Sequence, residues 1–82
     1  MDSGFDTLRK DLAQNVRQSR RARKMSQEEL AFEADIDRTY VSQIERSVIN
    51  PSLLVLYKVA FALGTTVPIL IAKPSKQSQD RD

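Results

Sequence analysis

Polar side chains that can read nucleic-acid bases are concentrated in one short run of the chain. The run contains Arg38, Thr39, Tyr40, Ser42 and Gln43. In a DNA major groove, arginine pairs with guanine, glutamine pairs with adenine, and hydroxyl groups bond either base. Val41 and Ile44 stand among these residues at the three-residue spacing of a buried helix face, which leaves the polar set facing outward. We therefore predict a recognition helix over 37–46; an ordinary helical hairpin with a solvated face is the alternative.

The residues that enzymes and metal sites usually need are missing. The chain has no histidine and no cysteine, which removes the commonest general base, the commonest metal ligand and any disulfide. The sequence also has neither a glycine-rich phosphate loop nor paired carboxylates of the kind that flank a scissile bond. We expect no catalysis, no metal, no cofactor and no small-molecule ligand.

The recognition helix needs a partner helix, and the sequence over 25–45 predicts one. Ser26 and Glu29 have the spacing of a capping box, in which each side chain accepts a backbone N–H of the other residue. Asp35 ends this helix because a short polar side chain tolerates the left-handed backbone. Asp37 then caps the recognition helix. The predicted helix has a narrow apolar stripe, formed by Leu30, Ala31 and Ala34.

A longer helix is predicted before this pair, over about 5–23, after a frayed start at 1–4. Its apolar stripe is formed by Phe5, Leu8, Leu12 and Val16. Arg20 lies four residues after Val16 and therefore points at the core, where an unpaired charge is costly. Glu45 lies on the inward edge of the recognition helix. We infer an Arg20–Glu45 ion pair; in the alternative, both side chains reach out to solvent.

A run of basic residues ends the first predicted helix. Between positions 17 and 24 there are five basic residues and no acidic one, although the net charge of the chain is only +2. Such a run is usually a solvated helix face, but beside a DNA-reading helix it becomes a candidate phosphate-facing patch. The members of the run are Arg17, Arg20, Arg21, Arg23 and Lys24.

The fourth predicted helix is apolar nearly all round. Ser52 caps it, Gly64 ends it, and Pro51 disfavours helix before it. Its core face is expected to contain Leu53, Leu56, Val59, Ala60 and Leu63. So small a protein cannot bury the remaining apolar residues within one subunit. We therefore predict a dimer interface at Leu54, Val55, Tyr57, Lys58, Phe61 and Ile69.

The length of 82 residues indicates one small all-α domain over 1–73. A short fifth helix or turn follows near 65–71, and the polar residues 74–82 are expected to be a disordered tail. No apolar run could cross a membrane and no signal-peptide pattern stands at the start. We expect a cytoplasmic protein without a membrane partner.

Three segments together resemble the Cro/C1-type (Xre-family) DNA-binding domain over about 8–71. They are R-x-x-R-x-x-K-M-S-Q-E-E-L-A, I-D-R-T-Y-V-S-Q-I-E-R and N-P-S-L-x-x-L-x-K-V-A-x-A-L-G. The resemblance implies a compact five-helix bundle of the lambda-repressor type, in which the second and third helices form a helix-turn-helix. The run at 37–40 also looks like the controller proteins of restriction–modification systems.

The resemblance implies a role for individual residues. Arg38, Thr39 and Gln43 match positions that reach base edges, and Tyr40 and Ser42 match flanking contacts. Gln27 matches a glutamine that bonds a phosphate and braces the recognition helix, and Asn50 matches a phosphate-holding position. Arg20 and Glu45 match an interior ion pair. Arg23, Lys24 and Arg46 complete the expected phosphate contacts.

Two residues depart from the family pattern: Asp35 and Ser47 stand where the family usually has glycine. Neither is expected to abolish the fold. The resemblance implies dimerisation through the late helices. The expected function is that of a homodimeric transcription regulator on a near-palindromic DNA operator. An antitoxin-like or adaptor module, binding another protein through the fourth and fifth helices, is the alternative.

Overall fold

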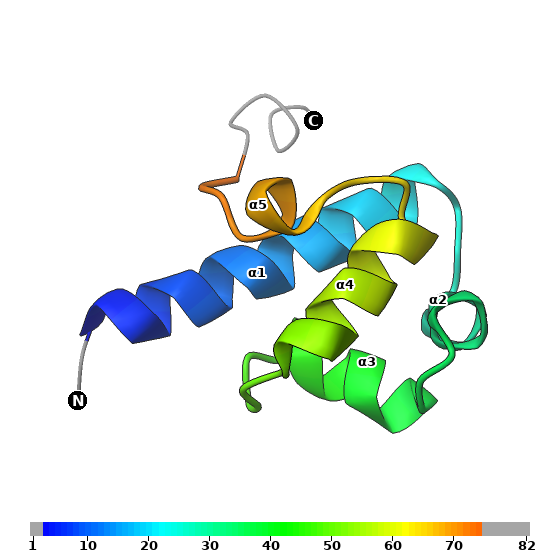
Figure 1. Cartoon of the computed structure of the whole chain (residues 1–82), viewed down its shortest axis with the longest axis horizontal. Helices are drawn as coiled ribbons and strands as arrows, with labels where there is room; N and C mark the ends of the chain where they lie inside the picture. Colours follow the sequence, from blue (N-terminus) through cyan, green and yellow to red (C-terminus); the bar gives the residue numbers. More distant parts are fainter. Residues whose placement is uncertain (1–2, 75–82) are drawn as a thin grey trace.

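The computed structural model describes residues 3–74, which form a bundle of five helices without a strand (Figure 1). In chain order the helices are α1 (Ser3–Ala22), α2 (Gln27–Ala34), α3 (Arg38–Glu45), α4 (Leu53–Ala62) and α5 (Val67–Leu70). Both α3 and α5 pack against α1, while α2 packs against both α3 and α4. The predicted all-α fold and the order of its helices are confirmed.

The helix starts are set by the predicted caps. The Ser26 hydroxyl accepts the Glu29 backbone N–H at 2.9 Å, and the Glu29 carboxylate accepts the Ser26 N–H at 2.7 Å. Asp37 and Ser52 cap α3 and α4 in the same way, each with a side-chain oxygen that accepts a backbone N–H of the first turn. These contacts satisfy donors that a helix start leaves without a partner.

The four longer helices all end in the same turn. The first or second residue after each helix is left-handed, with φ between +57° and +72°, at Lys24, Asp35, Ser47 and Gly64. In each turn, the next residue donates its N–H to a carbonyl five positions back, as Val48 does to Gln43 at 3.1 Å. This pair of features is the Schellman motif, which usually employs glycine. The helix ends predicted at Asp35 and Gly64 are confirmed, whereas the left-handed Lys24 was not predicted.

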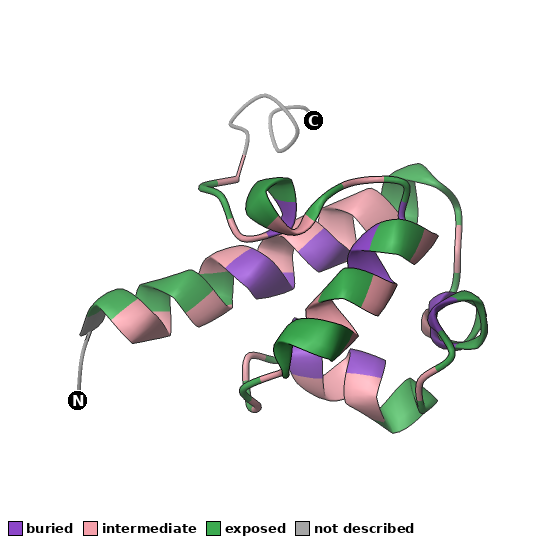
Figure 2. Cartoon of the chain, in the orientation of Figure 1, coloured by how far each residue is buried: buried purple, intermediate pink, exposed green. Residues whose placement is uncertain are grey.

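The core lies where the five helices meet. Its six largest fully buried side chains are Val16, Leu30, Val41, Ile44, Val59 and Leu70. Figure 2 shows the buried residues on the facing sides of these helices. Because α4 meets the core along one narrow face, Leu53 is 74% exposed, and its prediction as a core residue is wrong. Val55 instead lies half-buried against the core.

The first turns of α1 extend beyond the bundle (Figures 1 and 2). Ser3 and Gly4 are helical, so the prediction of a frayed start is wrong for these two residues. Leu12 and Val16 are buried as expected, but Leu8 is 40% exposed because no other helix covers this part of α1. The buried face of α1 is therefore shorter than the apolar stripe that the sequence periodicity predicts.

Within the described residues 3–74, no helix is long and apolar enough to cross a membrane. The same residues contain no group of three potential ligands that could hold a metal ion. Residues 75–82, most of the predicted disordered tail, lie outside the part of the chain that the structure describes.

Candidate nucleic-acid interface

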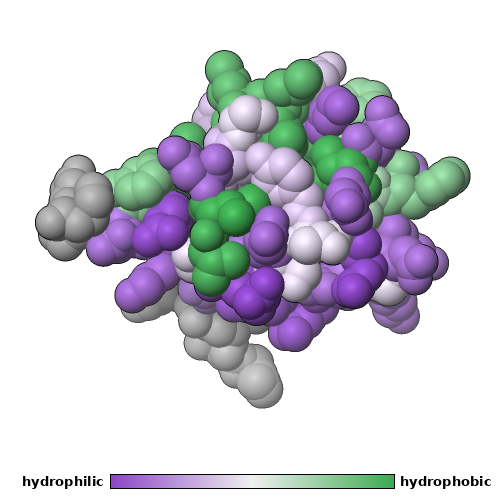
Figure 3. Space-filling model, turned by 90° about the horizontal axis from the view of Figure 1, so that it is seen from below, coloured by the Kyte–Doolittle hydropathy of each residue, from purple (hydrophilic) through white to green (hydrophobic). Residues whose placement is uncertain are grey.

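The helix α3 separates its buried face from a polar outward face. Val41 and Ile44 are fully buried, and the Asp37 side chain accepts the Thr39 N–H at 3.2 Å, which fixes the start of the helix. The exposed and partly exposed residues on the other side are Arg38, Thr39, Ser42 and Gln43. Figure 3, which views the molecule from the α3 side, shows hydrophilic side chains over much of this surface. The predicted outward set is therefore brought together on one face.

Among the predicted base-reading residues, Tyr40 differs from the others because its side chain packs against the core. This side chain is half-buried. The ring therefore contributes to the packing of α3, and only part of the side chain remains for a contact outside the protein.

An ion pair fixes α3 to α1. The Arg20 Nε lies 2.7 Å from the Glu45 Oε2, and the Arg20 Nη2 donates to the Glu45 Oε1 at 3.0 Å. The hydrogen bond that Arg20 donates to the Glu45 carboxylate raises the pKa of Arg20 above its ordinary value, while burial opposes this shift. The Glu45 side chain is only 4% exposed and that of Arg20 11%. The structure places this pair as the sequence predicted.

Gln27 links the ion pair to the outward face. Its Nε2 donates to the Glu45 Oε1 at 3.1 Å, and its Oε1 accepts a longer hydrogen bond, 3.4 Å, from the Arg38 Nη1. The side chain thus connects the start of α2 with both ends of α3. This geometry provides the bracing contact that the resemblance implied for Gln27.

The basic run divides into side chains with different environments. Arg17 turns inward and donates from Nη1 to the backbone carbonyl of Glu45 at 2.8 Å. A β-carbon added to Gly64 would lie 3.0 Å from the Arg23 guanidinium, so Arg23 lies against the turn after α4. Lys24 is exposed in the turn before α2. The basic run is therefore not a single continuous patch.

The remaining predicted phosphate contacts follow α3. Arg46 is the C-cap residue, is exposed, and donates from Nε to the Ser42 hydroxyl at 3.4 Å. Asn50 is exposed in the loop that leads to α4. Ser47 stands between them with a φ of +61°. The backbone of the loop is thus ordered by the turn that ends α3.

A second surface, apolar and exposed, lies on α4 and α5. Phe61 is 74% exposed, and its ring stacks on that of Tyr57 with centroids 6.3 Å apart. Lys58 is half-buried, 4.0 Å from the exposed Asp35 carboxylate. The residues that form this surface, called the late apolar surface below, are Leu53, Leu54, Tyr57, Phe61 and Ile69. Leu53 was not predicted to belong to it, and Val55 was.

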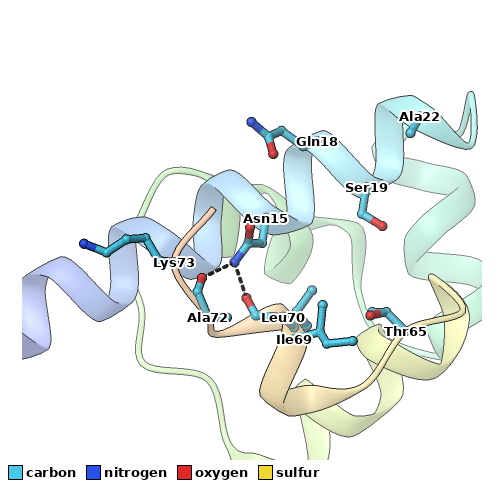
Figure 4. A pocket seen from close by; sticks show the side chains of 9 residues that line it. All are labelled: Asn15, Gln18, Ser19, Ala22, Thr65, Ile69, Leu70, Ala72 and Lys73. Atoms are coloured by element: carbon cyan, nitrogen blue, oxygen red, sulfur yellow. Dashed lines mark hydrogen bonds between the residues drawn. The ribbon is translucent and has the colours of Figure 1, made fainter. Parts of the chain in front are cut away.

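A groove of about 400 Å³ lies between α1 and α5. In Figure 4 the Asn15 side chain points from α1 toward the end of α5, where its Nδ2 donates to the carbonyls of Leu70 (2.8 Å) and Ala72 (2.7 Å). These two hydrogen bonds fasten α5 to α1. Asn15 therefore has a structural role that its sequence position did not indicate.

Two capped helices at an ordered turn, with a polar face on the second, define a helix-turn-helix protein. The helix-turn-helix family model matches residues 16–70, and the chain belongs to the Cro/C1-type (Xre) family of DNA-binding transcription regulators. The family resemblance seen in the sequence is thereby confirmed.

Among relatives, the control protein C.SmaI of Serratia marcescens is 36% identical over 78 residues, which is 95% of this chain and 93% of the relative. The control protein C.BamHI of Bacillus amyloliquefaciens is 48% identical over 60 residues, 72% of this chain and 74% of the relative. This chain is similar to both over most of their lengths.

Two solved structures have the same fold. The hypothetical transcription factor NHTF from Neisseria has a TM-score of 0.80 and 43% identity, over 85% of this chain and 80% of that one. The restriction–modification controller protein C.AhdI from Aeromonas hydrophila has a TM-score of 0.73 and 39% identity, over 76% of this chain and 94% of that one. The chain is thus a helix-turn-helix regulator close to restriction–modification controllers.

Proposed function

We propose that the protein is a homodimeric regulator of transcription that reads a near-palindromic operator as the controller of a restriction–modification system. The observation that carries this proposal is the polar outward face of α3, held in place from behind by the Arg20–Glu45 pair. The similarity to two control proteins and to a restriction–modification controller supports the finer assignment.

The proposed base contacts come from the outward face of α3. Arg38 pairs with guanine through O6 and N7, and Gln43 reads adenine or supports a neighbouring contact. Thr39, Ser42 and the accessible part of Tyr40 make the flanking contacts. The exposure of Arg38 and Thr39 supports this assignment.

The proposed phosphate contacts surround that face. Gln27, Lys24 and Arg23 come from the α2 side, and Arg46 and Asn50 from the loop after α3. Phosphate contacts set the position of a protein on DNA and supply affinity without sequence preference. The exposure of Lys24, Arg46 and Asn50 favours this role, while the place of Arg23 beside Gly64 makes it the most peripheral member.

The proposed homodimer uses the late apolar surface. Large exposed apolar groups gathered on one side of a small protein mark an interaction surface, and a twofold-symmetric contact buries the same patch on both copies. Two recognition helices then lie about 34 Å apart, one turn of DNA, and read two related half-sites.

The test is selection of binding sites from random duplex DNA with the purified protein at moderate salt. The expected result is a twofold-related motif whose half-sites are about one helical turn apart. Recovery of no motif, with binding that only decreases as salt increases, would overturn the operator-reading proposal.

A second candidate function is a protein-interaction module, since the same late apolar surface could bind a different protein. Analytical ultracentrifugation of the purified chain separates the two candidates. A tight homodimer uses the surface for self-association and supports the first proposal. A monomer at micromolar concentration leaves the surface free and favours the second.

A further inference from the structure

Residues 4–10 of α1 contribute no buried residue to the core, yet they make a well-defined contact with the loop after α3. The Arg9 Nη1 donates to the backbone carbonyl of Ser47 at 2.9 Å, across 38 positions of sequence. The Arg9 Nη2 lies 2.9 Å from the Asp6 Oδ1, and the guanidinium carbon lies 5.3 Å from the Phe5 ring centroid. These residues precede the segment that matches the family model.

The carbonyl that Arg9 contacts belongs to Ser47, whose left-handed backbone needs stabilising contacts. Ser47 has a φ of +61°, and a left-handed non-glycine residue persists only where its surroundings fix it. The Ser47 N–H donates to the Ile44 carbonyl at 3.1 Å. The Ser47 carbonyl accepts from Arg9, so both backbone polar groups of this residue are hydrogen-bonded. The proposed phosphate contacts Arg46 and Asn50 flank Ser47 in the chain.

The end of α3 also receives positive charge from α1. The last turn of α3 has no basic residue of its own, although cations stabilise the negative end of a helix dipole. Arg17 and Arg9 supply that charge from the side, at the carbonyls of Glu45 and Ser47. Both terminal nitrogens of Arg9 donate within the protein, to Ser47 and to Asp6.

We propose that Arg9 is a positioning residue of the DNA interface, held by Asp6 and Phe5, which fixes the loop that contains Arg46 and Asn50. Its function depends on the proposed phosphate contacts of that loop, and it acts without touching DNA. The projecting start of α1 thereby serves the DNA interface rather than the core.

The decisive variant is Asp6→Asn, because a simple charge effect and the positioning role of Arg9 predict opposite changes in DNA affinity. Removing a negative charge from a DNA-binding protein should strengthen binding to any duplex. If Asp6 instead holds Arg9 in position, the variant should weaken binding by about threefold to tenfold, the equivalent of one hydrogen bond. The matched control is Asp11→Asn on the same helix, which makes the same charge change away from Arg9 and should bind as tightly as the wild type or slightly tighter.

Two more measurements complete the experiment. Arg9→Lys keeps the charge but loses the fork that joins Asp6 to Ser47, and should weaken binding as Asp6→Asn does. Amide hydrogen exchange of the free protein should accelerate at Ser47 and Val48 in both variants. The Met25 amide, which closes the equivalent turn after α1, should keep its wild-type exchange rate.

Affinity is measured on the selected operator and on random duplex DNA, since phosphate contacts act on both. If the wild type selects no operator, the proposed function fails, while the random duplex and the exchange rates still test Arg9. Unchanged exchange at Ser47 and Val48, or faster exchange with undiminished DNA binding, would overturn the positioning role.

Discussion

At the scale of single residues, Glu45 is the centre of the polar contacts behind the recognition helix. Its carboxylate accepts hydrogen bonds from Arg20 and Gln27, and its backbone carbonyl accepts one from Arg17. A buried carboxylate is tolerated only with such partners. Three helices of the chain are thereby connected at one residue.

We predict that Glu45→Gln destabilises the protein by about 3 kcal/mol, because the variant leaves the nearly buried Arg20 without its counter-ion. Urea unfolding measures the loss. Glu33→Gln, at an exposed position of α2, should change the free energy of unfolding by less than about 0.5 kcal/mol. Equal small effects at both positions would contradict the importance of the pair.

We predict that Ser47→Gly stabilises the fold by about 1 kcal/mol, because glycine adopts a φ of +61° without a steric penalty. Gly64→Ala should do the reverse, since a β-carbon there would also lie 3.0 Å from the Arg23 guanidinium. Thermal unfolding measures both changes. A loss of stability in Ser47→Gly would show that the serine hydroxyl contributes more than the backbone strain costs.

Some of these residues were predictable and others were not. Arg20 and Glu45 could be paired from the sequence because each interrupts the apolar face of its own helix. Leu8 and Leu53 were assigned to the core because periodicity identifies a face but not whether a neighbour covers it. The contact of Arg9 could not be predicted from the sequence, because a side chain that bonds a distant backbone carbonyl leaves no spacing pattern among the residue types.

At the scale of helices, α2 and α3 divide the proposed DNA contacts between them. Arg38→Ala should reduce discrimination at one base pair by about 1–3 kcal/mol, because it removes a bidentate contact to a base. Gln27→Ala should instead weaken all sequences to a similar extent. Titration of the operator, its single-base variants and random DNA distinguishes the two. Equal losses on operator and random DNA for Arg38→Ala would contradict its base-reading role.

The α4 helix provides the other element-scale prediction. Phe61→Lys should shift the proposed dimer toward monomer without unfolding the subunit, because this side chain is 74% exposed in the subunit. Phe32→Lys is the matched control, since Phe32 is 82% exposed on α2 and does not belong to the late apolar surface. Sedimentation velocity measures both. Dimers of equal strength in the two variants would place the interface elsewhere.

The helices themselves were largely predictable because their ends have chemical causes. Ser26, Asp37 and Ser52 mark three helix starts, and Asp35 and Gly64 mark two ends. The turn at Lys24 was not foreseen, since lysine has no preference for a positive φ. The extent of α1, predicted as 5–23, was foreseen to within two residues, since it is Ser3–Ala22.

At the scale of the whole molecule, the bundle presents two surfaces of different character. The outward face of α3 is polar, and the late apolar surface lies on α4 and α5. Figure 1 places α3 and α5 on opposite sides of α1. Each is fastened to α1 by hydrogen bonds: Arg17 and Arg20 bind α3, and Asn15 binds the end of α5.

In the proposed dimer, the packing of the helices within each subunit sets the distance between the two recognition helices, and so the length of DNA between the half-sites. One added base pair between half-sites displaces the second by about 3.4 Å and about a tenth of a turn, and the proposed dimer can follow this displacement only by deforming its interface or its subunits. An operator with one inserted base pair should therefore bind little better than a single half-site, whereas a central substitution that keeps its length should bind nearly as well as the original. Undiminished binding to the lengthened operator, measured by titration, would mean that the dimer contact yields. The proposed dimer thereby distinguishes operators by the distance between their half-sites as well as by their base sequence.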